Sequence, residues 1–371
     1  MATFEKRQNG NKTVYRVKIR VKGYKPISAT FDRLTDARIW ANGIESDMKT
    51  GKYIDVSESI KHTLGDLIDR YIKYKLPQRR AISQKYFKTQ LLWWKSQIGD
   101  LLLKEVTPNV IAEQRDILVK EPNIHSTKQK QLRTGATVNS YLATLSIVLG
   151  KGVTEWGWLN ENPVLKVDKC KENNARTRFL DENEQARLLQ ACKECPNPIL
   201  YVVVVLTLST GARQGEIMNL QWNNIKFNDK EKSMTLYFMN TKNGDNRSVT
   251  ISGLAYNLLK EWQQANANKK VRKIKNYVFP SPTGEKPYYI RRQWENALKS
   301  ANITDFRFHD LRHTTASNLA MNGASLRDIG EILGHKTPAM TQRYSHLTEK
   351  YTTKVLKELN DKQFSEVQND R

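Results

Sequence analysis

Four short stretches near the carboxyl end of the sequence carry residue types that could act on an anion. Arginine, lysine, histidine and tyrosine occur within residues 210–216, 241–244, 309–313 and 333–344. Four of the six histidines lie between residues 309 and 346. Because histidine titrates near neutral pH and perturbed titratable groups gather at functional sites, this clustering predicts a site that binds an anion and moves a proton.

The residue types fit covalent cleavage of a phosphodiester. Arg213 and Arg312 could each donate two hydrogen bonds to the non-bridging oxygens of one phosphate, and stabilise the extra charge of a pentavalent transition state. Histidines can add a hydrogen bond or accept a proton. Lys242 could protonate the leaving oxygen. The phenol of Tyr344 could attack the phosphorus and hold the cut end covalently.

The sequence predicts neither a cofactor nor a metal. It has no acidic cluster suited to Mg²⁺ and no GxxxxGK[ST] nucleotide loop. Cys192 and Cys195 form a C-x-x-C without a second pair, so we expect no structural zinc. His309 and His313 lie four apart and could share a metal on one helical face. The residues between them, however, lack the glutamate base of zinc peptidases.

Single residues of this set also have ordinary structural explanations. Arg213 could simply pair with Glu216, and Tyr344 could be a core residue. We assign packing or hydrogen-bonding roles to His313 and His346. Only the whole set, in its order along the chain, favours a reactive site.

Composition indicates a polyanionic partner. The 371 residues include 61 Lys and Arg against 38 Asp and Glu, a formal net charge of +23. Residues 1–60 carry 12 basic and 7 acidic side chains, residues 61–170 carry 18 and 10, and the remainder 31 and 21. Because every part of the chain is basic, DNA or RNA is the expected partner.

The sequence also predicts a compartment. No apolar run approaches 18 residues, and no apolar stretch follows the first charges of the chain, so we expect no membrane span and no secretory signal. Three cysteines cannot form a disulfide framework, which fits a reducing cytosol. We therefore expect a cytoplasmic protein associated with the nucleoid.

Recognisable elements surround the reactive residues. Asp181 and Glu184 form a capping box at the start of a helix. A buried-looking apolar run follows Pro198 and leads into the stretch that contains Arg213. An Asn243-Gly244 turn predicts a hairpin between residues 234–239 and 247–251, with Lys242 at its tip.

The first 57 residues predict a small sheet with one basic face. Residues 13–22 alternate with a period of two, and a second alternating run, a short first strand and a helix complete a three-stranded sheet backed by one helix. No acid interrupts the charged side of residues 13–22, which favours contact with DNA through a strand face. The predicted DNA-binding residues are Arg16, Lys18, Arg20 and Lys22.

Residues 61–165 predict an all-helical bundle. Thr63 can cap its first helix, and further helical runs follow near residues 86–98, after Pro108 and over 137–156. Residues 169–178 are short and polar, and we interpret them as a linker between domains.

The ordered set of Arg213, Lys242, His309-x-x-Arg312, His335 and Tyr344 resembles the tyrosine recombinase family of phage integrases. The motifs span about residues 180–350, and a Leu-Gly-His stretch ends nine residues before the tyrosine. The amino-terminal sheet resembles the arm-type DNA-binding domain of many integrases. Two positions depart from the usual pattern, Ala212 in place of Leu and Asn224 in place of Asp, and we expect neither to affect the mechanism.

The resemblance implies a role for each residue of the set. Arg213 and Arg312 would clamp the scissile phosphate, and Glu216 would orient the first arginine. Tyr344 would form a 3′-phosphotyrosine link. Lys242 would be the acid that protonates the 5′ oxygen. His309 would be the proton acceptor or a phosphate ligand, and His335 would contact the phosphate.

The sequence thus predicts a multidomain α+β protein. We expect an arm-binding domain (residues 1–57), a helical core-binding domain (61–165), a mainly helical catalytic domain with a small sheet (175–360) and a tail (361–371). Residues 346–371 would dock on a neighbouring subunit.

The resemblance also implies a partner set and an activity. It implies a homotetramer on double-stranded DNA at core and arm attachment sites, working through a Holliday junction to integrate or excise a prophage or genomic island. A host DNA-bending protein and an excisionase are candidate accessory partners. A type IB topoisomerase and a non-enzymatic DNA-binding regulator remain as alternatives.

Overall fold

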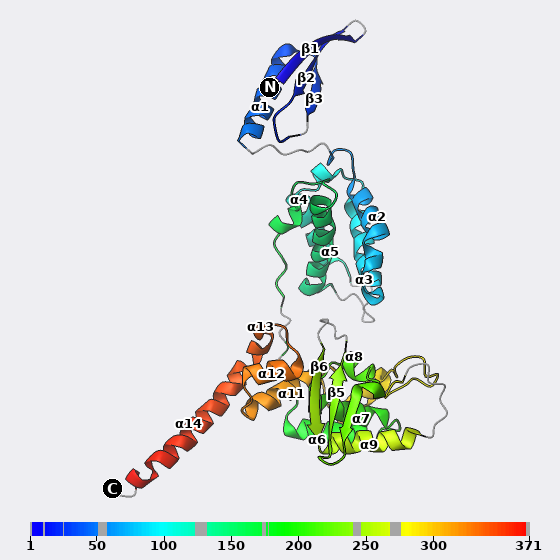
Figure 1. Cartoon of the computed structure of the whole chain (residues 1–371), viewed down its shortest axis with the longest axis vertical. Helices are drawn as coiled ribbons and strands as arrows, with labels where there is room; N and C mark the ends of the chain where they lie inside the picture. Colours follow the sequence, from blue (N-terminus) through cyan, green and yellow to red (C-terminus); the bar gives the residue numbers. More distant parts are fainter. Residues whose placement is uncertain are drawn as a thin grey trace. The chain divides into compact units, whose positions relative to one another are not determined.

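The computed structural model describes residues 2–9, 12–24, 26–50, 58–122, 132–172, 176, 178–239, 246–267 and 276–368. The chain divides into two units, Met1–Asn174 and Ala175–Arg371 (Figure 1). In the described residues each unit contains helices and one three-stranded sheet, so the predicted α+β class is confirmed. No helix among these residues is long and apolar enough to cross a membrane.

The first unit begins with an antiparallel sheet in the order β1-β2-β3, backed by one helix. Val17 and Ile19 on the central strand pack against Ala37, Ala41 and Met48 of the helix. The predicted sheet and helix are therefore confirmed. The elements are β1 (Ala2–Asn9), β2 (Lys12–Ile19), β3 (Ile27–Phe31) and α1 (Leu34–Lys49).

The predicted basic face of this sheet needs correction. Strand β2 ends at Ile19, so Arg20 and Lys22 follow the strand instead of lying on it. Glu5 of β1 lies opposite Arg16, and its carboxylate accepts a hydrogen bond from Lys18 at 2.7 Å. The face around Arg16 and Lys18 therefore includes an acid from the neighbouring strand, which the alternation within one strand could not reveal.

The second part of this unit is the predicted helical bundle. Thr63 caps α2 as expected, because its hydroxyl accepts from the Asp66 amide and the Asp66 carboxylate accepts from the Thr63 amide. Trp94 is fully buried and donates to the Tyr141 carbonyl at 2.9 Å. The helices are α2 (Leu64–Tyr74), α3 (Ala81–Ile98), α4 (Pro108–Lys120) and α5 (Gly135–Thr154), with short turns η1 (Leu76–Gln78), η2 (Leu103–Glu105) and η3 (Pro163–Lys166).

In its described residues, the first unit has two separate hydrophobic clusters, one within residues 17–48 and one within residues 64–164. The predicted boundary between an arm-binding and a core-binding domain falls between them, at residues 57–61. That division stays a prediction.

The second unit is built on α7, a helix without a polar face. Its apolar run is buried nearly throughout, with α6, α9 and α11 packed against it. The predicted capping box is confirmed, because Asp181 accepts from the Glu184 amide at 2.7 Å. The first elements are α6 (Glu182–Lys193), α7 (Ile199–Thr210), α8 (Gln214–Met218), η4 (Trp222–Asn224), β4 (Ile225–Asn228), β5 (Ser233–Phe238), β6 (Arg247–Ser252) and α9 (Leu254–Ala267).

Strands β5 and β6 are the two predicted hairpin strands, and they pair antiparallel as expected. Strand β4 was not predicted, and it completes the sheet in the order β4-β5-β6. The remaining elements are α10 (Arg291–Ser300), α11 (Asp310–Met321), α12 (Leu326–Leu333), α13 (Pro338–Thr341), η5 (Gln342–Tyr344) and α14 (Ser345–Gln368).

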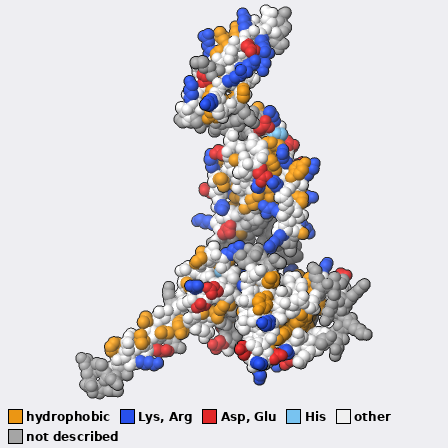
Figure 2. Space-filling view, viewed as in Figure 1, with side chains coloured by type: hydrophobic (Ala, Val, Ile, Leu, Met, Phe, Trp, Pro, Cys, Tyr) orange, Lys and Arg blue, Asp and Glu red, His pale blue; other side chains and the backbone are white. Residues whose placement is uncertain are grey.

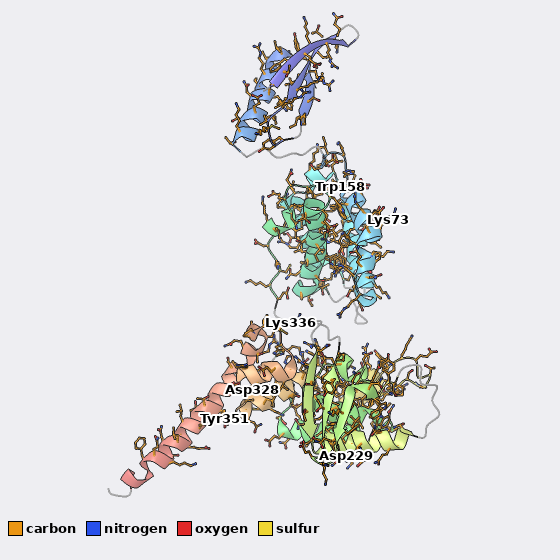
Figure 3. The ribbon with its side chains drawn as sticks, viewed as in Figure 1. Lys73, Trp158, Asp229, Asp328, Lys336 and Tyr351 are labelled. Carbon is orange, nitrogen blue, oxygen red and sulfur yellow. The ribbon has the colours of Figure 1, made fainter. Side chains whose placement is uncertain are left out.

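Helix α14 projects from the rest of the second unit and exposes apolar side chains (Figures 1 and 2). Near its start, Leu347 packs in a small cluster with α11 and α12, and Tyr351, labelled in Figure 3, lies against Gly323. Beyond this point it exposes 40–55% of Val355, Leu356, Leu359 and Phe364.

A glycine ends α7 and permits the close packing of α12. Gly211 has φ +61°, and a Cβ added there would lie 2.2 Å from Cδ2 of the buried Leu333. Both the left-handed backbone and the lack of space therefore require glycine.

We predict that Gly211→Ala lowers the unfolding free energy of the second unit by roughly 1–3 kcal/mol through backbone strain, and further through overpacking. Gly215→Ala in α8 is the matched control, because a Cβ there meets no atom within 4 Å. It should be neutral or stabilise by about 0.4–1 kcal/mol. Calorimetric midpoints of both variants check this, and equal midpoints would contradict it.

Candidate active site

Helices α7 and α11 bring two predicted arginines together. Thr315 of α11 donates to the Leu208 carbonyl of α7 at 3.0 Å. Arg312, one turn earlier on α11, is 4% exposed and donates through Nη1 to the Gly211 carbonyl at 2.8 Å. Arg213 follows Gly211 by two residues. The short loop after α7 therefore accepts a hydrogen bond from Arg312 and also contains Arg213.

Glu216 lies between two guanidinium groups. One carboxylate oxygen accepts from Arg213 Nη1 at 2.9 Å, and the other accepts from the Arg213 amide at 3.0 Å and from Arg247 Nη2 at 2.9 Å. The expected pairing of Arg213 with Glu216 is therefore present. Its role in orienting the arginine for a reaction stays a prediction.

Sequence reasoning missed Arg247, the first residue of β6. Its guanidinium lies 4.5 Å from the ring centre of Phe238, its cross-strand neighbour on β5. Only 10% of its side chain is exposed. One signal could have found it, a basic residue directly opposite a buried aromatic one in the predicted hairpin.

The arginines repel one another in a poorly hydrated place. Burial, together with the positive charges of Arg213 and Arg247, lowers the pKa of Arg312 to about 9. Burial is also the main cause that lowers the pKa of Arg247, with Arg213 adding to it. The three guanidinium groups therefore give the site a surplus of positive charge over Glu216.

The predicted nucleophile is buried and hydrogen-bonded to a histidine. Tyr344 is 5% exposed, and its hydroxyl lies 2.6 Å from Nδ1 of His313. Burial raises the pKa of Tyr344, while the charges of Arg343 and Arg312 oppose that rise. The phenol therefore remains protonated in this conformation at neutral pH. The expected hydrogen-bonding role of His313 is present, but the partner was not foreseen.

His313 is neutral at pH 7. Burial, followed by the charge of His309, lowers its pKa to about 4. The two imidazole rings lie 5.5 Å apart, centre to centre. A neutral imidazole has one acceptor nitrogen, so Nδ1 can accept a hydrogen bond from the tyrosine hydroxyl when the other nitrogen carries hydrogen.

His335 is oriented by a buried threonine. Helix α12 ends at Leu333, Gly334 caps it in the left-handed conformation, and His335 follows. Its Nδ1 lies 2.7 Å from Oγ1 of Thr341, which is 2% exposed. Burial, followed by the charges of Arg312 and Arg213, lowers the pKa of His335 to about 4. This histidine therefore lies within electrostatic range of both arginines.

The other predicted site residues lie as follows. His309 immediately precedes α11 and is exposed. Lys242 lies outside the described residues, between strands β5 and β6. Arg16, Lys18, Arg20 and Lys22 belong to the first unit.

The predicted linker ends in a contact with the site. Asp310, 2% exposed, follows His309 and accepts hydrogen bonds from Arg176 Nη2 and the Arg307 amide, both at 2.8 Å. Arg176 also pairs with Asp305 at 3.0 Å. The last residues of the linker therefore hold the turn that presents His309 and Arg312.

The described residues contain no group of three or more His, Cys, Asp and Glu that could hold a metal ion. Cys192 is buried in α6, and burial raises its pKa to about 12, so it remains a thiol at neutral pH.

Comparison with known proteins places this site in a family. Residues 178–350 match the Phage integrase family. The chain is 31% identical over 288 residues to the shufflon-specific DNA recombinase of Escherichia coli, covering 77% of this chain and 70% of the relative. It is 32% identical over 247 residues to the integrase of Salmonella phage P22, covering 65% of this chain and 60% of the relative.

A solved structure shares the fold. The lambda integrase tetramer bound to a Holliday junction matches with a TM-score of 0.57 at 19% identity, over 90% of this chain and 96% of that chain. The chain belongs to the phage integrase family of tyrosine recombinases.

We predict that the second unit loses stability as the pH falls from about 6.5 to about 4. His313 and His335 have lowered pKa values in the folded state, so the unfolded chain binds more protons across this window. The unfolding free energy therefore rises with pH in the window and levels off above it. Thermal midpoints between pH 4.5 and 7.5 measure the slope.

His313→Gln and His335→Gln should each flatten that slope. His346→Gln is the matched control, because this side chain is exposed and should leave the slope unchanged. A slope equal to wild type in both site variants would contradict the assignment.

Proposed function

We propose that this chain is a site-specific recombinase that cuts and rejoins DNA through Tyr344, in integration or excision of a prophage or genomic island. The observation that carries the proposal is the placement of the Tyr344 hydroxyl. It is hydrogen-bonded to His313 and within electrostatic range of Arg312, which in turn lies within range of Arg213. The proposed nucleophile, the residue that holds it and the two proposed phosphate ligands therefore come from separate elements.

In the proposed reaction Tyr344 Oη attacks the phosphorus, and the bond to the 5′ oxygen breaks. Arg213 and Arg312 hold the non-bridging oxygens and stabilise the added negative charge. His335 contacts the same phosphate, and Lys242 gives its proton to the departing 5′ oxygen. The product is a 3′-phosphotyrosine, whose energy is retained for rejoining without a nucleotide.

The tyrosine proton leaves toward a histidine. His313 shares a hydrogen bond with the hydroxyl, and His309 lies beside it at the start of α11. We assign His309 as the proton acceptor or a phosphate ligand, and His313 as the residue that holds the hydroxyl before attack. The low pKa of His313 suits it to accept a hydrogen bond at neutral pH.

The proposal extends to the whole chain. Residues 1–57 bind arm sites, residues 61–165 grip one side of the core site, and residues 175–360 hold the other side and perform catalysis. A homotetramer on two duplexes works through a Holliday junction in the cytoplasm, with a host bending protein and an excisionase as accessory partners. The likeness to the integrase of Salmonella phage P22 and to the lambda integrase tetramer bound to a Holliday junction supports an integrase that assembles on DNA.

We predict that Tyr344→Phe abolishes covalent attachment to DNA while the protein still binds DNA, because only the attacking oxygen is removed. Wild type and variant are expressed with candidate element DNA and quenched with denaturant, and the DNA attached to protein is sequenced. Wild type should give adducts at a few reproducible sites, and the variant none.

Tyr351→Phe, which removes a hydroxyl from α14 outside the site, is the matched control and should keep the adducts. Adducts scattered over any duplex would favour a type IB topoisomerase. Intact DNA binding without adducts in either protein would favour the regulator.

We also predict that the exposed face of α14 docks on a neighbouring subunit. Leu356→Ser with Leu359→Ser should raise the protein concentration needed for assembly on DNA by roughly tenfold or more, because buried apolar surface is lost. Both side chains are about half exposed, so the fold of each subunit should persist.

Thr352→Ser with Asn360→Ser is the control for the α14 prediction, because it changes the same helix without removing large apolar surface. Sedimentation of the protein on Holliday-junction DNA measures assembly. Unchanged assembly in the leucine variant would refute the docking role.

A further inference from the structure

Arg247 is enclosed beside the proposed phosphate site by groups from three elements. The Phe238 ring of β5 lies 4.5 Å from its guanidinium carbon. Glu216 of α8 accepts from its Nη2. Gly334, at the end of α12, lies so near that an added Cβ would be 2.7 Å from Arg247 Cδ and 3.0 Å from Nε. The glycine before His335 therefore leaves room for this arginine.

The hydrogen bonds of Arg247 are incomplete. A guanidinium carries five N–H donors, and buried ones are normally paired. Nε and Nη1 of Arg247 are buried and have no acceptor among the described residues, and the same holds for Nη2 of Arg312. Arg247 and Arg312 therefore both lack acceptor oxygens for some of their buried N–H groups.

The site is also short of negative charge. Arg213, Arg247 and Arg312 lie within electrostatic range of one another, with Glu216 as their carboxylate partner. Arg213 already occupies Glu216 through two hydrogen bonds. If Arg247 served only to neutralise Glu216, one N–H group would suffice, and its other buried donors would have no use.

A group that supplies both acceptor oxygens and negative charge would satisfy these observations. A phosphodiester has two non-bridging oxygens that share one negative charge, and its pentavalent transition state carries a second charge. We infer that Arg247 is a third guanidinium ligand of the scissile phosphate, donating through an unpaired N–H group at Nε or Nη1 while Nη2 holds Glu216. This assignment rests on the proposed function of the site.

The inference predicts an anion effect that needs no DNA. In the full-length protein, inorganic sulfate should raise the thermal midpoint of the second unit above that in chloride of equal ionic strength, because it supplies the missing acceptors. Arg247→Met keeps the side-chain volume and leaves Glu216 paired with Arg213. It should weaken the apparent sulfate affinity by about tenfold or more.

Without anions, Arg247→Met should unfold at the wild-type temperature or above, because it removes a repelling buried charge. The matched control is Arg327→Met, which removes the same charge from an 86% exposed site on α12. It should leave the sulfate response unchanged. An Arg247→Met response equal to wild type would overturn the inference.

A second experiment separates direct contact from support of Glu216. Full-length enzyme is mixed at saturation with a nicked DNA that traps the phosphotyrosine, carrying either a normal phosphodiester or a methylphosphonate at the scissile position. Arg247→Met should slow adduct formation on the phosphodiester by about 10²–10³-fold. Arg247→Lys keeps the positive charge but loses the planar set of donors. Its rate of adduct formation should therefore lie between those of wild type and Arg247→Met.

On the methylphosphonate, which lacks the charged oxygen, the penalty of Arg247→Met should shrink markedly, because the two changes remove the same interaction. Equal penalties on both substrates would show that Arg247 acts only through Glu216, and would overturn the direct contact. If wild type forms no adduct on either DNA, the proposed function fails. The sulfate titration then still decides whether Arg247 belongs to an anion site.

Discussion

The second unit depends on keeping several positive charges together away from water. Arg213, Arg247 and Arg312 lie around the single carboxylate of Glu216, and moving such groups out of water is costly unless each finds partners. The surrounding packing must offset this cost. Helix α7 is buried nearly throughout, and its carboxyl end supplies the carbonyl that holds Arg312. The apolar core therefore stabilises a site that is unfavourable by itself, as is usual where strain or charge is retained for function.

Burial, together with nearby positive charges, sets the protonation of the neighbouring histidines. His335 lies near two of the arginines and His313 near His309 and Arg343, and both imidazoles are partly buried, so both stay neutral at pH 7. A protonated histidine there would add charge to a region that already has a surplus. Tyr344 is subject to opposite influences, since burial disfavours its phenolate while the arginines favour it. The resting site thus combines charged arginines with neutral histidine and tyrosine side chains. The neutrality of the two histidines depends on their burial more than on their residue type.

Sequence patterns predicted what depends on near neighbours. The cap at Thr63 and the capping box at Asp181 were foreseen, because each joins residues three apart, and the strands β5 and β6 followed from their turn. The hydrogen-bond partners of several side chains in distant segments were not foreseen. Arg247 and Arg176 bind carboxylates 31 and 134 residues away, and Lys18 binds Glu5 across two strands. Side-chain partners of this kind depend on tertiary packing, which neither periodicity nor a motif encodes.

The neutral resting state has a consequence for the proposed attack. A phosphodiester beside Tyr344 adds negative charge, which disfavours a free phenolate further, so the proton must move as the new bond to phosphorus forms. Its arrival on His309 would create a cation beside His313, whose pKa is already lowered by burial and by the charge of His309, so this cation alone would be unfavourable. At that moment the phosphorus gains its second negative charge. The positive charge on histidine and the negative charge on phosphorus therefore stabilise each other only when they develop together, which ties proton transfer to bond formation in one step.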